Sequence, residues 1–129
     1  MRTIVINTTE KKEVVDITKD IEKILPKGEG LCVGFVLHTT AALTTADLDP
    51  GTDKDMLEAF DNMIPDLNYR HPHDPSHVGD HILSTMIGAS VSVPYSNGSL
   101  LLGTWQRVVL FEFNGPRERS IVLTFLKGN

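Results

Sequence analysis

From Gly88 onward the chain contains short strand patterns separated by turn signals, which excludes an all-helical fold. The strand patterns cover residues 90–94, 99–102, 107–113 and 119–126. Asn97-Gly98 separates the first two, and this dipeptide tolerates the positive φ angles that a tight hairpin demands. Residues 114–117 separate the last two, so we expect a second antiparallel pair there.

Apolar residues in the earlier part of the chain recur at helical spacing in three sets. The sets are Ile17, Ile21, Ile24 and Leu25; Met56, Leu57, Phe60, Met63 and Ile64; and Val78, Ile82 and Met86. They end before Pro26, before Pro65 and at Gly88, which are residues that stop helices. We expect three helices, with the methionine-bearing second set packed in the core.

Strand patterns also cover residues 3–7, 13–16 and 31–37. The continuous apolar character of 31–37 predicts burial on both faces. Helices in the first two thirds of the chain and hairpins at its end indicate an α+β fold with a mainly antiparallel sheet.

The length of 129 residues suits one domain, and the chain has no internal repeat and no linker. We therefore expect a single domain over residues 1–129. No apolar stretch approaches the roughly 20 residues that a membrane helix needs, and residues 1–12 lack the apolar region of a secretory signal. These features favour a cytoplasmic protein that does not enter membranes.

The net charge of −5 is unevenly distributed. Residues 46–80 contain nine acids against Lys54 and Arg70, whereas residues 100–129 contain four bases against two acids. A surface of this kind disfavours nucleic acid as a partner but allows a small local phosphate site.

Cys32 is the only cysteine, so no internal disulfide can form. It stands inside the apolar run 31–37, and we expect a buried thiol rather than a catalytic one.

Four of the five histidines lie within eleven residues, and the pair His77 and His81 carries the most information. A separation of four residues on a helix brings two imidazoles to one face, about 5–6 Å apart at Cβ, close enough to share a divalent ion. His38, at the end of the buried strand, is a candidate third ligand. A solvated helix face is the alternative for the pair, and His71 and His73 are expected to be surface residues.

Two aspartates flank the helical histidines. Asp80 should point to a different side of the helix and could act as a base or as a partner to a ligand. Asp74 precedes Pro75, and a helix cap is the expected role for it.

Glu112 shares a strand face with Val108 and Leu110, opposite Phe111 and Phe113. A buried unpaired carboxylate is costly, so Glu112 is either paired with a base or held at a functional site. The residues alone leave both roles open.

Four further residues could contact a ligand. Trp105 could form a wall for a planar ligand, although a core position is commoner, and Gln106 could donate or accept hydrogen bonds. Arg117 and Arg119 stand beside a glycine-containing turn that would suit a phosphate, and the alternative is a pair of solvated hairpin charges.

Several blocks in a fixed order resemble one known family. The blocks are His38-Thr39-Thr40-Ala41-Ala42-Leu43-Thr44, Asp49-Pro50, His77-Val78-Gly79-Asp80-His81, Ser84, Gly88-Ala89-Ser90, Gly103-Thr104-Trp105-Gln106 and Glu112-Phe113-Asn114-Gly115-Pro116-Arg117. Together, over nearly the whole chain, they are similar to the YjbQ family, also called UPF0047. Residues 44–48 depart from the family's pattern, so no role is transferred to Asp47.

The resemblance implies a compact α+β subunit that assembles as a homotrimer. It also implies a metal and anion site at the positions of His38, His77 and His81. Members have been described as secondary thiamine-phosphate synthases, which join a pyrimidine pyrophosphate to a thiazole phosphate.

We therefore expect a metal-dependent enzyme acting on a phosphorylated small molecule, with thiamine-phosphate synthase as the specific candidate. Its cofactor would be a divalent metal, Zn²⁺ or alternatively Mg²⁺. The expected roles are metal binding for His38, His77 and His81; proton transfer or orientation for Asp80 and Glu112; and substrate or phosphate binding for Thr39, Trp105, Gln106, Arg117 and Arg119. A metal-assisted hydrolase and a noncatalytic trimer that binds a metal or a metabolite are the alternatives.

Overall fold

The structure, a computed structural model, describes residues 1–71 and 74–129. Its strands are β1 (Arg2–Asn7), β2 (Glu13–Asp16), β3 (Glu29–Val36), β4 (Ala41–Asp47), β5 (Ser90–Ser96), β6 (Ser99–Leu100), β7 (Gln106–Glu112) and β8 (Glu118–Lys127). Its helices are α1 (Thr18–Glu22), α2 (Thr52–Met63), the short 3₁₀ helix η1 (Pro75–His77) and α3 (Val78–Ile87). The described ranges therefore confirm an α+β fold with three α-helices.

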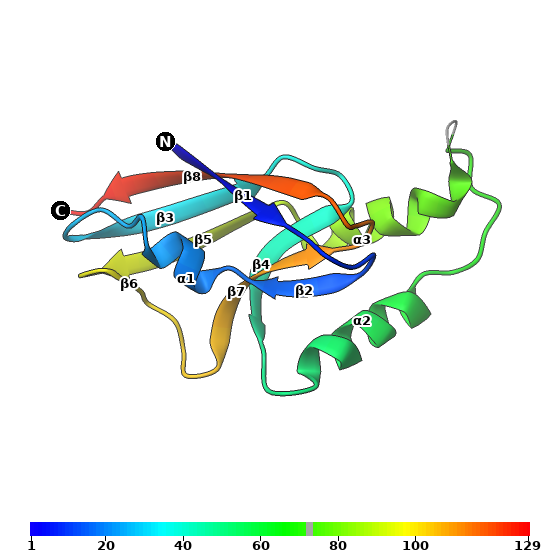
Figure 1. Cartoon of the computed structure of the whole chain (residues 1–129), viewed down its shortest axis with the longest axis horizontal. Helices are drawn as coiled ribbons and strands as arrows, with labels where there is room; N and C mark the ends of the chain where they lie inside the picture. Colours follow the sequence, from blue (N-terminus) through cyan, green and yellow to red (C-terminus); the bar gives the residue numbers. More distant parts are fainter. Residues whose placement is uncertain (72–73) are drawn as a thin grey trace.

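Two antiparallel sheets form the molecule (Figure 1). The larger has the strand order β1-β8-β3-β5-β6, and the smaller has the order β2-β7-β4. The main hydrophobic core lies between them and α1, where apolar side chains of β3 and β8 meet those of β7. A second cluster packs the other face of β7 against α2 and α3.

The predicted hairpin at Asn97-Gly98 is confirmed. Both residues have positive φ, 51° for Asn97 and 85° for Gly98, and β5 pairs with β6 across them. These angles match a two-residue turn whose twist suits the flanking strands.

The predicted pairing of the last two strands is wrong. β7 pairs with β2 and β4 in the smaller sheet, whereas β8 pairs with β1 and β3 in the larger one. A turn signal shows only that the chain reverses, and strand partners are chosen by contacts between distant segments. The turn at 114–117 therefore connects two sheets, which brings Glu112 and Arg119 together in the core.

β3 is buried on one face only, contrary to the prediction. Cys32 and Val36 point into the core, whereas Phe35 is 49% exposed on the opposite face. Leu37, directly after the strand, is also exposed. The described residues leave this face of β3 partly exposed, so the apolar run does not mark two buried faces.

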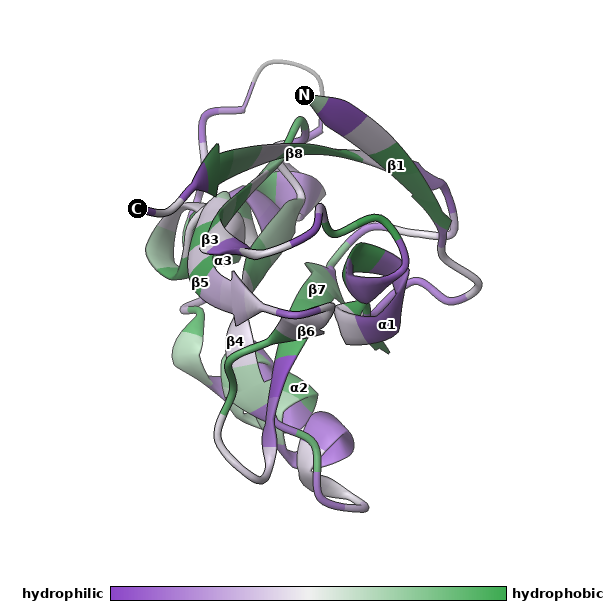
Figure 2. Ribbon diagram, turned by 90° about the vertical axis from the view of Figure 1, so that its left-hand side faces the viewer, coloured by the Kyte–Doolittle hydropathy of each residue, from purple (hydrophilic) through white to green (hydrophobic). Residues whose placement is uncertain are grey.

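α2 lies at the end of the molecule opposite β1 and β8 (Figure 2). None of its residues is fully buried, and Met63 is 55% exposed, so the predicted core position is wrong for that methionine. Met56, Leu57 and Ile64 of the same set are partly buried against the second cluster, as predicted. Phe60 still packs its ring edge-on against Phe111, with centroids 5.3 Å apart. The helix thus covers the smaller sheet without being enclosed.

α3 ends at Gly88, as predicted, with a φ of 103° at that glycine. Its buried residues are Asp80, Leu83 and Ser84, not the set Val78, Ile82 and Met86 that shares another face. Ser84 anchors the helix by donating a hydrogen bond of 2.6 Å to the carbonyl oxygen of Ala41. Among the described residues, no helix is long and apolar enough to cross a membrane.

The buried thiol predicted for Cys32 is confirmed. Burial raises its pKa to about 11. The thiol is therefore protonated near neutral pH and is a poor nucleophile.

Candidate functional site

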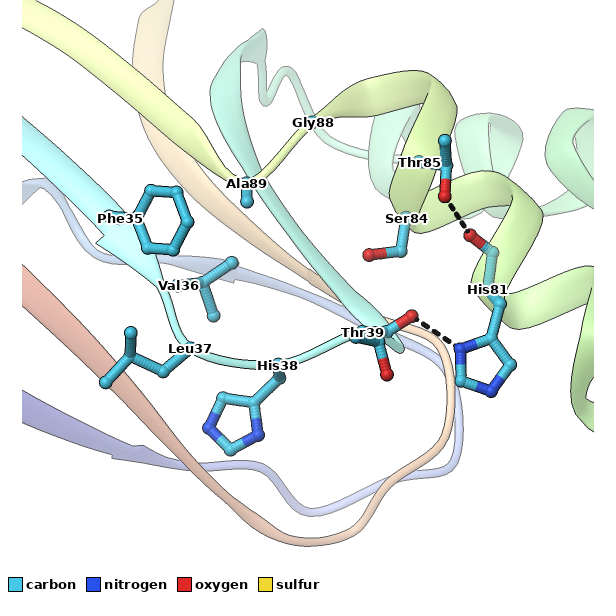
Figure 3. Close-up of a pocket in the computed structure, with 10 residues that line it drawn as sticks. All are labelled: Phe35, Val36, Leu37, His38, Thr39, His81, Ser84, Thr85, Gly88 and Ala89. Atoms are coloured by element: carbon cyan, nitrogen blue, oxygen red, sulfur yellow. Dashed lines mark hydrogen bonds between the residues drawn. The ribbon is translucent and has the colours of Figure 1, made fainter.

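A pocket of about 620 Å³ lies between the end of β3 and α3 (Figure 3). Its lining residues are Phe35, Val36, Leu37, His38, Thr39, His81, Ser84, Thr85, Gly88 and Ala89. We call it the β3–α3 pocket. It brings together two of the three predicted metal ligands, His38 and His81, from segments 43 residues apart in the sequence.

The hydrogen bond at one nitrogen of His38 sets the tautomer of its ring. The backbone N–H of Ser120 donates to Nε2 at 2.9 Å, so the proton of the neutral ring resides on Nδ1. Burial lowers the pKa of His38, and the nearby positive charges of Arg119 and Arg117 lower it further, against the opposing effect of Glu112. At neutral pH His38 is therefore an uncharged ring with an N–H to donate.

His81 presents the complementary tautomer. Its Nδ1 lies 3.0 Å from the carbonyl oxygen of Thr39, which can only accept, so Nδ1 carries the proton (Figure 3). The lone pair of Nε2 is then available to a proton or to a metal. Hydrogen bonding of the far ring nitrogen to a carbonyl is also how metal-binding histidines are oriented.

His71 contacts this site, which the sequence did not predict. Its ring stacks on that of His81, with centroids 5.2 Å apart and planes 15° apart. The backbone N–H of Asp74 donates to its Nδ1 at 3.0 Å. The clustering of histidines in the sequence hinted at a shared site, but it could not show the path of the loop that brings His71 to His81. His73 lies outside the described residues.

His77 does not line the β3–α3 pocket, and both of its ring nitrogens have partners. The side-chain amide of Asn114 lies 3.2 Å from Nδ1, and a carboxylate oxygen of Asp74 lies 3.1 Å from Nε2. His77 thereby connects the start of α3 to the turn after β7. Asp74 also accepts from the backbone N–H of Ser76 at 3.0 Å, which confirms its predicted role as a helix cap.

The three predicted ligands differ in their fitness for a metal. Within the ranges 1–71 and 74–129, no three His, Cys, Asp or Glu side chains converge as a metal-binding group. The Nε2 lone pair of His38 accepts a hydrogen bond from the backbone N–H of Ser120. The two ring nitrogens of His77 contact Asn114 and Asp74. His81 is the member of the three that offers a nitrogen lone pair.

Glu112 and Arg119 form a buried ion pair, which is one of the two roles considered for Glu112. Glu112 is 0% exposed and Arg119 is 1% exposed. Arg119 donates from Nε at 2.9 and 3.1 Å and also from Nη2 to the carboxylate. Arg119 is therefore not the solvated hairpin charge considered from the sequence.

The ion pair also holds the segment that carries His38 and Thr39. Nη2 of Arg119 donates to the carbonyl oxygen and the hydroxyl of Thr40, at 3.1 and 2.9 Å. Thr8 donates to Glu112 at 2.6 Å, so the ends of β1, β7 and β8 meet here. The pair thus supports the pocket wall from behind.

The pKa of Glu112 predicts how stability depends on pH. Burial raises this pKa, but hydrogen bonds from Arg119, Thr8 and the backbone of Asn114, with the charge of Arg119, together lower it below 4.5. As the pH falls, Glu112 takes up its proton at a higher pH in the unfolded chain than in the folded protein. The stabilisation is therefore complete above about pH 4.5 and is lost as the pH falls through the lower pKa that Glu112 has in the folded protein. Urea denaturation from pH 7 to 3 should show this loss, and replacing Glu112 and Arg119 with apolar residues should reduce it.

Arg117 is exposed beside this cluster. Its Nε donates to the carbonyl oxygen of Asn114 at 2.8 Å, which orients the side chain. Its Nη groups make no hydrogen bond to the described residues. Since its charge lowers the pKa of His38, it contributes positive potential at that end of the pocket.

Trp105 and Gln106 lie away from the β3–α3 pocket in this chain. Gln106 begins β7 and Glu112 ends it, a separation of about 20 Å at the rise of an extended strand. Trp105 is 65% exposed, not in the core as its residue type suggested. Gln106 holds the preceding turn, since its side-chain oxygen accepts from the backbone N–H of Gly103 at 3.0 Å.

Asp80 points to a different side of α3 from His81, as predicted. It lines a second pocket and not the β3–α3 pocket. Burial raises its pKa, against the effects of Lys12, Lys11 and the neighbouring histidines.

Comparison with known proteins identifies the family. The sequence model for the UPF0047 protein YjbQ-like family matches residues 2–128. The chain belongs to the UPF0047 family. Its UPF0047 relatives include YugU of Bacillus subtilis, 37% identical over 131 residues that cover 98% of each chain. A UPF0047 protein of Archaeoglobus fulgidus is 35% identical over 122 residues, which cover 94% of this chain and 97% of the relative.

Two solved structures have the same fold as this chain. The conserved hypothetical protein TT1486 of Thermus thermophilus superposes with a TM-score of 0.89 at 31% identity, covering 98% of this chain and 100% of TT1486. A yjbq/upf0047 family protein of Clostridium acetobutylicum gives 0.86 at 30% identity, covering 98% and 100%. This chain thus shares its α+β fold with antiparallel sheets with both structures.

Proposed function

We propose that the protein is an enzyme that acts on a phosphorylated small molecule in the β3–α3 pocket. The observation that carries this proposal is the pair of complementary imidazoles, with a donor N–H on His38 and a free lone pair on His81. One ring can donate to a phosphate oxygen while the other accepts a proton or binds a metal. Both rings could act in this way while His38 keeps its hydrogen bond from Ser120 and His81 keeps its hydrogen bond to Thr39.

Phosphate would bind at the end of the pocket nearest His38. Nδ1–H of His38, the hydroxyl of Thr39 and the free Nη groups of Arg117 are donors suited to phosphate oxygens. Arg119 adds positive charge from the core while its guanidinium stays bound to Glu112. In this proposal Arg119 and Glu112 position the site rather than touch the substrate.

A divalent metal is part of the proposal through His81. Nε2 of His81 fits such an ion, and Thr39 would keep the ring oriented toward it. A bound ion would polarise a phosphate oxygen or a water molecule. Among the described residues, His38 and His77 already have partners for their lone pairs, so the substrate, water or another subunit would supply further ligands in this proposal.

The specific reaction we propose is the thiamine-phosphate synthase reaction, in which a thiazole nitrogen attacks a pyrimidine methylene carbon and pyrophosphate leaves. We also propose the homotrimer as the assembly. The exposed apolar residues Phe35 and Leu37 at the rim of the pocket support self-association, because an uncovered apolar sheet face is a common subunit interface.

The phosphate site can be tested with inorganic pyrophosphate. Arg117→Ala should weaken its binding by about 10- to 100-fold, because a charge-assisted hydrogen bond contributes about 1.5–3 kcal/mol. Isothermal titration calorimetry measures the affinity. Arg107→Ala is the matched control, because Arg107 stands near the other end of β7 in an ion pair with Asp16. Equal affinities for the two variants would remove Arg117 from the site.

Product analysis by mass spectrometry tests the reaction itself. A synthase should need both the pyrimidine pyrophosphate and the thiazole phosphate, and should release pyrophosphate. Consumption of one phosphorylated substrate alone would indicate a hydrolase. Binding without turnover would indicate a noncatalytic protein.

A further inference from the structure

A second pocket, of about 410 Å³, lies on the other side of α3 from His81. It is bounded by the end of α2, the segment after it, the start of α3 and Lys12 from the β1–β2 connection. We call it the α2–α3 pocket. Its polar lining includes Lys12, Asp61, Asp66, Tyr69, Ser76 and Asp80. None of the residues that line it also lines the β3–α3 pocket.

Asp80 is the unusual residue of this pocket. Asp80 is 7% exposed, yet its carboxylate accepts no hydrogen bond and forms no ion pair with the described residues, although Lys12 and Lys11 act on it through their charges. Among the described residues, every fully buried side-chain nitrogen or oxygen has a hydrogen-bond partner. Since the carboxylate oxygens of Asp80 have none, they are not fully buried and must reach the open space of the pocket. The residue is buried apart from this opening, and burial raises the pKa of its carboxyl group, so a cation that enters the pocket would stabilise the charged form.

The charges of the pocket indicate which ligand it would take. Lys12 forms an ion pair with Asp61, which leaves Asp66 and Asp80 as acids in excess. No metal-binding group of three side chains is present among the described residues, so these acids are not arranged for a metal ion. Apolar side chains, among them Ile64 and Leu83, also line the pocket. A cation with an apolar body matches this combination.

We propose that the α2–α3 pocket binds a small organic ammonium ion, with its charged nitrogen on the carboxylate of Asp80 and its alkyl part against Leu83 and Ile64. An ammonium group supplies the hydrogen-bond donors that Asp80 lacks and balances the excess acids. This site is independent of the function proposed for the β3–α3 pocket.

Titration with n-butylammonium, followed by ¹⁵N–¹H NMR at pH 7, tests the proposal. The backbone amides of Gly79 and Leu83 should shift saturably with butylammonium, but not with 1-butanol or butyrate. Asp80→Asn should weaken binding at least tenfold. Asp55→Asn, which makes the same charge change at an exposed position of α2, should leave the affinity within twofold. Equal shifts with 1-butanol, or an unchanged affinity in Asp80→Asn, would overturn the proposal.

Two further measurements separate a binding role from a structural one. Asp80→Asn should raise the melting temperature, because it removes a buried charge that has no partner; a lower melting temperature would indicate a structural role and count against the proposal. Lys12→Gln removes the competing cation and should tighten butylammonium binding severalfold. This variant keeps the proposal falsifiable if Asp80→Asn fails to fold, since weaker or unchanged binding would contradict it.

Discussion

Arg119→Met should lower the free energy of unfolding by about 3–5 kcal/mol, because removing one partner of a buried ion pair leaves the other charge buried and uncompensated. Glu112 would keep its hydrogen bonds from Thr8 and from the backbone of Asn114, but these do not neutralise it. Thr40 would also lose both bonds from the guanidinium. Urea denaturation at pH 7 measures the change.

The double variant Arg119→Met with Glu112→Leu should recover most of that loss, because apolar residues of similar volume can replace a buried ion pair at little net cost. Arg107→Met is the control for loss of an arginine from a partly exposed pair and should cost less than about 1 kcal/mol. A double variant as unstable as the single one would show that Arg119 stabilises the fold mainly through Thr40 and packing.

His81→Ala should reduce turnover of the proposed reaction by about 10²–10⁴-fold, the range expected when a positioned acid or base is removed. It should also lower the metal content of protein purified with Zn²⁺. The fold should survive, because the hydrogen bond that the His81 ring makes to the carbonyl oxygen of Thr39 is exposed at the edge of the pocket. Steady-state kinetics, metal analysis and circular dichroism measure the three effects.

His77→Ala is the matched comparison, because it removes an imidazole four residues away on the same segment. Its ring is bound to Asn114 and Asp74, so its loss should cost about 1 kcal/mol of stability and leave most of the activity. If His77→Ala abolished activity and metal binding while His81→Ala did not, our assignment of the free nitrogen to His81 would be wrong.

Local signals predicted the fold well where the structure depends on neighbouring residues. The hairpin at Asn97-Gly98 and the helix stop at Gly88 formed as expected, since both depend on backbone angles at one or two residues. The partners of β7 and β8 did not follow from their turn, because strand pairing depends on segments far away in the sequence. The burial of α2 was overestimated for a related reason, since periodicity shows an apolar face but not how deeply it is covered.

The candidate site was predicted as a list of residues but not as a geometry. His38 and His81 line one pocket, whereas Trp105, Gln106 and Asp80 do not. The spacing predicted that His77 and His81 share one face of a helix, but His77 lies in η1, before α3 begins, and does not line the pocket. The spacing also could not show that Asn114 and Asp74 bind the ring of His77. His71 joined the site through a loop whose path the sequence did not indicate.

Residue patterns alone were sufficient for the fold class, most element positions and the family, because these depend on local conformational preference and on the order of motifs along the chain. Three-dimensional packing assigned the partners: Arg119 to Glu112, the Ser120 N–H to His38 and the Thr39 carbonyl oxygen to His81. It gave Asp80 no hydrogen-bond partner among the described residues. The reason is physical. The protonation state and free valence of a side chain depend on atoms within about 3 Å of it, and in this protein most of those atoms come from residues tens of positions away.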